Sequence, residues 1–467
     1  MKRVSNLTKL VTLAMIICGS AIVSSQDLKP EELSYQEFVG YVKQFHPAVR
    51  QADLEISKAE AGLMAARGGF DPKLEVDLDQ KQFKGTQYYS LLNSVFKIPT
   101  WYGVELKAGV DNSEGIYINP QNRTPSNGLT SLGLSVPLGQ GLLINQRMAD
   151  LRIAKIQLNL SKAERQVQAS NVLYEASAAY YNWVRTYREF SLHEQYLKFA
   201  IDRQKNIIRT IELGDKPSID SIEGGIVIRN RELNLEEAKL KLIKGKLELS
   251  NFLWINNVPV ELQDNIVPQT DIEDQIIDRS DAPASDDIGF LNSHSKIQLL
   301  QGKVLLFNVE RQLKGNMLLP QIDIGYHRLF EADEIETSSS MDYKFGLNFR
   351  FPLFLRKERA GFKLAKLKVQ DAQLSLDLER YQLQNKIESQ QNEIVSLQRQ
   401  LKLAKALVND YQAMFESEEK LFAYGESSLF LVNSRENMVV SSKISQINLI
   451  VRYLTSQAEL DKLLATF

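Results

Sequence analysis

The chain has 467 residues, a formal net charge of -2 and 43% hydrophobic residues. This length suits two or more ordinary domains, and the balanced charge argues against the basic surface that tracks nucleic-acid phosphates. The single cysteine, Cys18, falls in the N-terminal leader, so we expect no disulfide framework in the mature chain.

The N-terminus predicts a secretory signal peptide over residues 1–25. Basic residues precede an apolar run from Leu10 to Ile17, and small residues near Ser24 suit cleavage. A second interpretation stays open, in which Cys18 carries a lipid, although lipoproteins normally have a small residue before that cysteine. Beyond the signal, no apolar run reaches the roughly 20 residues of a membrane-spanning helix. If the chain crosses a membrane, it must do so with strands.

A helix is predicted to follow the signal. Ser34 and Glu37 have the spacing of a capping box, and the helix runs to about Arg67 with an interruption at His46, which precedes a proline.

Alternating segments then predict strands. Residues 73–79 and 129–138 alternate between polar and apolar, which is typical of strands with one wet face. The stretch between them, residues 84–128, is rich in aromatics, Gly and Asn and contains another strand-like segment at 103–110. Two interpretations stay open for this stretch: an external loop, which we favour, or an extra hairpin in the sheet.

Long helices come next. One is predicted from about Leu142 to Leu213, and after a turn at Gly214 another continues to about Asn256. The second helix has two apolar heptad series about 200° apart, which suits a closed ring where each helix has a neighbour on either side. The series are Ile226, Leu233, Leu240, Leu247 and Trp254, and Ile228, Leu235, Leu242 and Leu249.

Residues 257–287 contain prolines and many Asp without a period, and they predict a linker. It divides the mature chain into a first repeat at 26–256 and a second at 288–467. Each repeat has the order helix, strands, long helix, turn, helix.

The spacing of landmarks supports this duplication. His46 lies 26 positions before Pro72, and His294 lies 26 positions before Pro320. The stretch between strand-end prolines is longer in the first repeat, which therefore contains an insertion.

The long helices also match in length. Ala154 lies 60 positions before Gly214, and Ala365 lies 60 positions before Gly425. A helix of this length extends about 90 Å, which is more than an ordinary globular domain spans. Its seam in the second repeat recurs every seventh residue, at Ile387, Ile394, Leu401, Val408, Phe415 and Phe422.

Two strands per repeat give four strands per chain, which cannot close a barrel alone because the smallest common membrane barrels have about eight. An open edge is not tolerated in lipid. The expected fold is an internally duplicated α+β membrane protein, in which a long coiled-coil α-helical barrel continues into an outer-membrane β-barrel shared by three copies.

The duplicated order of elements, the Gly-Leu-x-x-Pro-Leu strand end at 133–138 and the run from Ser428 to Asn437 resemble the TolC-type outer-membrane efflux family. The resemblance implies a homotrimeric channel-tunnel in the outer membrane lipid, with its helical part in the periplasm. It would act as the passive exit duct of a tripartite efflux or type I secretion system. Its implied partners are a periplasmic adaptor (membrane fusion) protein and an inner-membrane transporter of the RND or ABC class. The alternative is a periplasmic coiled-coil scaffold or adhesin without a pore.

The resemblance also assigns candidate sites. Characterised family members narrow the pore entrance with carboxylates six and nine residues after the second glycine, where this chain has Leu431 and Ser434, so that acidic ring is missing. Asp220 occupies the matching position of the first repeat. Glu426 is a further entrance candidate, with a solvated surface carboxylate as the alternative. The implied adaptor-docking tips comprise Gly214, Asp215, Asp220, Gly425, Glu426, Ser427 and Ser428.

No catalytic motif is present, so we expect neither an enzyme nor a cofactor. The histidines His46, His193, His294 and His327 lack metal-ligand spacing, and we expect no metal site. His46 and His294 occupy equivalent repeat positions, which predicts a shared packing role.

Overall fold

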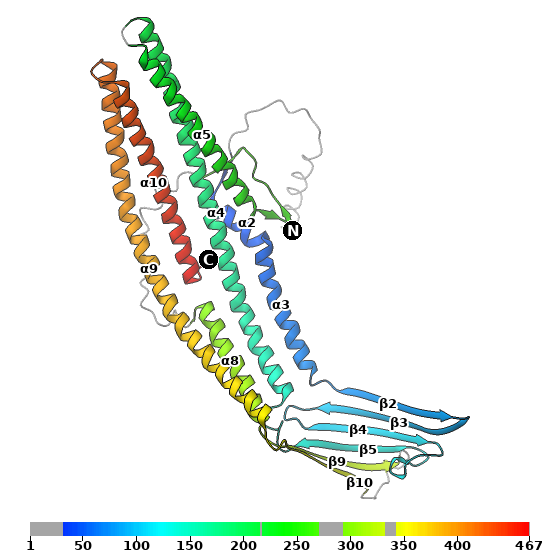
Figure 1. Cartoon of the computed structure of the whole chain (residues 1–467). Helices are drawn as coiled ribbons and strands as arrows, with labels where there is room; N and C mark the ends of the chain where they lie inside the picture. Colours follow the sequence, from blue (N-terminus) through cyan, green and yellow to red (C-terminus); the bar gives the residue numbers. More distant parts are fainter. Residues whose placement is uncertain (1–30, 215–216, 270–292, 332–341, 467) are drawn as a thin grey trace, which may run out of the picture.

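The computed structural model shows an elongated molecule, with a helical part and a six-stranded antiparallel sheet at one end (Figure 1). The predicted signal peptide, Cys18, Asp215 and the predicted linker beyond residue 269 lie outside the described residues. The structure describes residues 31–214, 217–269, 293–331 and 342–466.

In the first half of the chain, the long helix is α4 (Gln146–Glu212), with 67 residues. Helices α3 (Pro47–Gly68) and α5 (Ile219–Ser250) both pack along it, α3 toward the sheet and α5 toward the far tip (Figure 1). Two short helices therefore lie along one long helix.

The second half has the same arrangement. Helix α9 (Arg356–Ala423) has 68 residues, and α8 (Ser295–Asn316) and α10 (Leu429–Leu464) both pack along it. The predicted seam of α9 is confirmed, because its members from Ile387 to Phe415 are buried or half-buried. An apolar heptad on an otherwise polar helix buries one stripe only.

Helices α3 and α8 begin in the same way. Each has 22 residues and a histidine N-cap, His46 or His294, with φ −65° and ψ 130°. The imidazole Nδ1 accepts a hydrogen bond from the backbone N–H two residues later, at 3.3 Å for His46 and 3.2 Å for His294. The equivalence of the two histidines is confirmed, and their shared role is helix capping.

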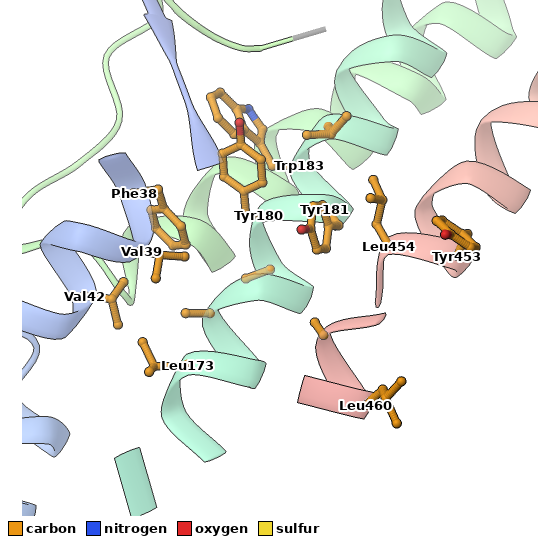
Figure 2. Packing of buried hydrophobic residues seen from close by; sticks show 14 of the residues in the cluster. Phe38, Val39, Val42, Leu173, Tyr180, Tyr181, Trp183, Tyr453, Leu454 and Leu460 are labelled. Atoms are coloured by element: carbon orange, nitrogen blue, oxygen red, sulfur yellow. The ribbon is translucent and has the colours of Figure 1, made fainter. Parts of the chain in front are cut away.

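A short helix, α2 (Tyr35–Phe45), precedes α3. Its predicted capping box is present, because the Ser34 hydroxyl accepts from the Glu37 N–H and the Glu37 carboxylate accepts from the Ser34 N–H. Helix α2 packs on the middle of α4, where the largest buried cluster lies (Figure 2). Trp183 and Tyr180 at its centre are fully buried. The largest apolar core of the helical part therefore lies at mid-length, and smaller buried clusters lie toward the tips and toward the sheet.

Short strands flank this cluster. Strand β1 (Glu31–Leu33) pairs in parallel with β8 (Ile266–Pro268), and β6 (Trp254–Ile255) pairs with β7 (Val258–Pro259). Strands β7 and β8 lie in the described part of the predicted linker. A 3-10 turn, η1 (Pro120–Asn122), lies in the first-half insertion.

The sheet has the strand order β10-β9-β5-β4-β3-β2, and all neighbours are antiparallel. The expectation of four strands per chain is therefore wrong, and so is the preference for an external loop at 84–128. The insertion supplies two strands to the middle of the sheet. The strands are β2 (Lys73–Phe83), β3 (Thr86–Pro99), β4 (Glu105–Glu114), β5 (Leu129–Pro137), β9 (Gln321–Glu331) and β10 (Tyr343–Arg350).

The alternation of β3 is blurred, which explains the error. Leu91 and Leu92 are adjacent, and so are Val95 and Phe96, so apolar residues occur on both faces of this strand. A period of two is then hard to recognise from the sequence, whereas the cross-strand pairing determines which residues share a face.

Candidate functional site

The sheet has one mainly apolar face, to which all six strands contribute every second residue, and which also includes Ser94, Asn112 and Arg328. For example, Phe96 of β3 lies between Leu74 of β2 and Ala108 of β4. Large side chains of this face are exposed in the single chain, Leu74 to 70% and Phe349 to 66%. A water-facing surface rarely carries so continuous an apolar patch, so this face requires a nonpolar environment. Its exposed large members are Leu74, Val76, Leu78, Phe96, Leu106, Val110, Leu132, Leu134, Tyr326, Tyr343, Phe345, Leu347 and Phe349.

The opposite, polar face carries charges. Lys97 pairs with Glu75 there, and Arg147 at the start of α4 contacts Glu105 with an Nη1–Oε1 distance of 3.0 Å. One cross-strand row runs from β2 to β10 on this face and consists of Lys73, Lys97, Lys107, Gly133, His327 and Lys344. The two faces of the sheet therefore suit different environments, one nonpolar and one aqueous.

The two predicted tips are helix ends. Gly214 follows α4 with φ +80°, and Gly425 follows α9 with φ +78°, a region that glycine adopts without strain. Each glycine ends a long helix and reverses the chain into α5 or α10 (Figure 1). The positive φ at both turns therefore explains why glycine occupies these positions.

The candidate residues of the second tip surround this turn. Glu426 is exposed, and the Ser427 hydroxyl donates to the Glu418 carboxylate. The Ser428 side chain caps α10 by accepting from the N–H of Leu431. Leu431 is 40% exposed. Glu426 is therefore the exposed charge beside this turn.

The remaining candidates lie on the first two turns of the returning helices. Asp220 is half-buried in the first turn of α5, and Ser434 is half-buried on α10. Asp220 suits the positive end of the helix dipole, so its presence there has a local explanation.

A groove of ≈ 650 Å³ separates α4 from α9 near the tips. Its walls include Arg203 and Phe199 on α4 and Phe415, Glu416 and Glu419 on α9. The groove is mixed in polarity and lies between the two helical hairpins.

A buried ionic cluster beside this groove joins the two halves, and sequence reasoning missed it. Glu436 of α10 is 0% exposed. Its Oε2 lies 3.0 Å from Arg203 Nη1 of α4 and 3.5 Å from Arg231 Nη2 of α5. Arg203 also reaches Glu419 of α9 at 3.5 Å. We call Arg203, Arg231 and Glu436 the tip cluster.

A signal for the tip cluster exists in the sequence. Leu429, Val432 and Val439 are buried on α10, and Glu436 occupies the same stripe at helical spacing. A carboxylate at such a position requires a buried partner, because an isolated buried charge is very unfavourable. The partners lie more than 200 residues earlier, so the sequence does not name them.

Within the described ranges, no group of three or more His, Cys, Asp or Glu side chains could hold a metal ion. No helix of the described part combines the length and the hydropathy needed to cross a membrane.

Residues 304–466 match the family model described as outer membrane efflux protein. The resemblance indicated by the sequence is confirmed by this match over the last third of the chain. The match to an outer membrane efflux protein model agrees with the expectation that the chain is not an enzyme. No curated protein matches the chain.

Solved structures share the fold. The chain is similar to CusC, with 12% identity and a TM-score of 0.68 over 94% of this chain and 95% of that chain. The CmeC outer membrane channel of Campylobacter jejuni has 13% identity and a TM-score of 0.65 over 96% of this chain and 90% of that chain. The MtrE outer membrane channel of Neisseria gonorrhoeae has 12% identity and a TM-score of 0.65 over 95% of this chain and 93% of that chain. The helix-rich α+β fold is therefore that of outer-membrane channels.

Proposed function

From the match to the outer membrane efflux protein family, we propose that three copies of this chain form a passive exit duct that crosses the outer membrane and extends into the periplasm. The observation that carries the proposal is the two-faced sheet, whose edge strands β2 and β10 each pair on one side only among the residues that the structure describes. The apolar face would contact lipid, and the polar face would line water.

The two edges of the sheet are complementary in direction. Strand β2 runs away from the helices and β10 runs toward them, so β2 of one copy and β10 of the next would pair in antiparallel fashion. Six strands are fewer than the roughly eight of the smallest common barrels, and lipid does not tolerate an open edge. Several copies must therefore share one barrel, and the family resemblance supports three.

Strand length supports this proposal. The edge strands β2 and β10 have 11 and 8 residues. At about 3.3 Å per residue and a tilt of about 40°, they rise roughly 20–28 Å along the barrel axis, close to the apolar band of outer-membrane barrels.

The helices offer further support. One apolar series of α5 packs on α4 and includes Leu249, which is fully buried. The other series is exposed in the single chain, with Leu233 exposed to 69%. A neighbouring copy would cover this second stripe and continue the ring of helices.

The long helices would extend about 100 Å from the membrane into the periplasm. We assign the adaptor-docking role to the residues around Gly214 and Gly425, and pore-entrance roles to Asp220, Glu426 and the positions of Leu431 and Ser434. A periplasmic adaptor protein and an inner-membrane transporter of the RND or ABC class would complete the tripartite system.

Purification from outer membranes and planar-bilayer recording test the function. We expect a detergent-extracted trimer that opens discrete ion-conducting channels, and a deletion strain that is more sensitive to toxic compounds or fails to secrete a product. A soluble periplasmic chain without conductance would instead support a scaffold or adhesin and would refute the duct.

A further inference from the structure

We propose that the barrel wall contains eighteen strands, six from each of three copies, and that the membrane section of the duct is wide enough for compact cargo the width of a small folded peptide. This inference rests on the proposed function. It starts from the insertion, which adds β3 and β4 to the middle of the sheet and not to its edge.

Backbone pairing on both sides makes the insertion part of the wall. Strand β3 pairs with β2 from Lys97 to Thr86, and β4 pairs with β5 from Glu105 to Asp111. In the sheet, β3 and β4 lie between β2 and β5, so β2 and β5 do not pair with each other. A loop folded over a barrel would leave β2 and β5 paired with each other.

The inserted strands continue the two faces of the sheet, although Leu91 and Val95 of β3 are apolar residues on the polar face. Phe96, Leu106 and Val110 extend the apolar face across β3 and β4. Lys97 and Lys107 extend the cross-strand row of the polar face. The strands of an external hairpin would be surrounded by water, so they would not need one apolar face and one polar face.

The β3–β4 turn is attached to the helices. The Trp101 ring stacks on Phe70 with centroids 5.6 Å apart, and the Asn145 side-chain Nδ2 donates to the Trp101 carbonyl at 3.2 Å. The Arg152 guanidinium lies 5.8 Å from the same ring. The inserted hairpin thus spans the full length of the sheet, from the end away from the helices to the helical part, as the other strands do.

The number of strands determines the width. With strands about 4.8 Å apart and tilted by about 40°, eighteen strands give a backbone diameter of about 36 Å, and twelve strands give about 24 Å. Side chains remove about 5 Å on each side, which leaves about 26 Å and about 14 Å.

This difference changes the class of cargo that fits. A helix with its side chains is about 10–12 Å wide, so a twelve-stranded barrel passes one helix or an extended chain. A compact peptide of about 40 residues is roughly 23 Å across and fits only the wider barrel. Gly109, Gly133, Gly325 and Gly346 lie on the polar face and add no side chains to the lumen.

Cysteine labelling tests the wall. The only cysteine of the chain lies in the predicted signal, so each variant carries one thiol. Val110 and Asp111 are neighbours on β4 with opposite facing, which makes Val110→Cys and Asp111→Cys a matched pair. In proteoliposomes, a membrane-impermeant maleimide should label Asp111→Cys at least ten times faster than Val110→Cys. Equal rates would place the insertion in water and overturn the proposal.

A deletion tests the width. Removing residues 84–114 deletes β3 and β4 and leaves four strands per chain. The two ends that are joined both lie at the end of the sheet away from the helices. Ser131 of β5 lies on the polar face and remains in this variant, so Ser131→Cys reports lumen access in both proteins. Maleimide polymers of graded size should reach it up to about 26 Å in the full chain and about 14 Å in the deletion. The same limit near 14 Å in both would refute the wider wall.

The labelling results are separable from the function itself. The full chain is first tested for trimer mass and conductance. A conducting trimer with equal labelling of Val110→Cys and Asp111→Cys rejects the eighteen-stranded wall alone, whereas absence of trimer and conductance rejects the duct. If the deletion variant does not fold, the proposal is still tested by the labelling rates of Val110→Cys and Asp111→Cys and by the size limit for labelling Ser131→Cys in the full chain.

Discussion

Neutralising Glu436 is expected to destabilise the contact between the two helical hairpins by about 3 kcal/mol, at the lower end of the cost of breaking a buried ion pair. Glu436→Gln keeps the shape of the side chain and one oxygen acceptor, but it removes the negative charge. Arg203 and Arg231 are then left as buried cations with no carboxylate between them.

The geometry supports this magnitude. Glu436 is 0% exposed and Arg231 is 4% exposed, so solvent screens their interaction poorly. Arg203 donates to both Glu436 oxygens, at 3.0 and 3.3 Å. Glu419 compensates in part, because its carboxylate lies 3.5 Å from Arg203, and this is why we expect a loss near the lower end of the range.

Chemical denaturation in detergent measures the effect, and amide hydrogen exchange in α10 localises it. A loss of about 3 kcal/mol corresponds to roughly a hundredfold change in the opening equilibrium of the tips. The matched control is Glu419→Gln, whose side chain is 51% exposed and whose loss should cost less than about 1 kcal/mol. Equal effects of the two substitutions would show that the tip cluster does not join the hairpins.

Three further predictions concern the caps, the turn and the lumen. Burial lowers the pKa of His46 and His294. As the pH falls, these histidines therefore take up protons at a higher pH in the unfolded chain than in the folded chain. The free energy of unfolding should be constant above about pH 6.5 and decrease below it, which denaturant midpoints measured against pH would show. His294→Asn keeps a capping oxygen and should make that dependence shallower, because only His46 of the two capping histidines then titrates. Gly425→Ala should cost about 1 kcal/mol, measured by thermal unfolding, because alanine is strained at φ +78°; an unchanged midpoint would exclude strain at this turn. Replacing Lys73 and Lys344 by Gln should shift the channel's reversal potential toward cations in a salt gradient. An unshifted potential would mean that this row does not face the conducting path.

The helical part could be predicted because its signals are local. The long helix of the second repeat has an apolar residue every seven positions, and both long helices end at a glycine, Gly214 or Gly425. The spacing of His46 and His294 from their following prolines revealed the duplication, and the structure gives both residues one capping role. Periodicity and caps are read within a few turns of chain, so no tertiary information was required.

The sheet was predicted less well because its information is shared between strands. Leu91 and Val95 are apolar residues on the polar face, and they conceal the alternation of β3. The tip cluster is harder still, since Arg203 and Glu436 meet across 233 positions of sequence. A single sequence shows that Glu436 interrupts an apolar stripe, but only the packing of α4 against α10 shows which cations neutralise it.

The position of the insertion explains how a wider wall is compatible with an unchanged helical part. The inserted β3–β4 hairpin begins and ends at the end of the sheet that lies away from the helices. Strand β2 therefore still starts below α3, and β5 still leads into α4. The long helices α4 and α9 accordingly differ by one residue in length, although only the first half of the chain contains the insertion. Strand number can therefore change without altering the height of the helices or the spacing of the tips. The width of the barrel and the docking of partners are then separable properties of this chain, and labelling in the wall and substitution in the tip cluster should have independent effects.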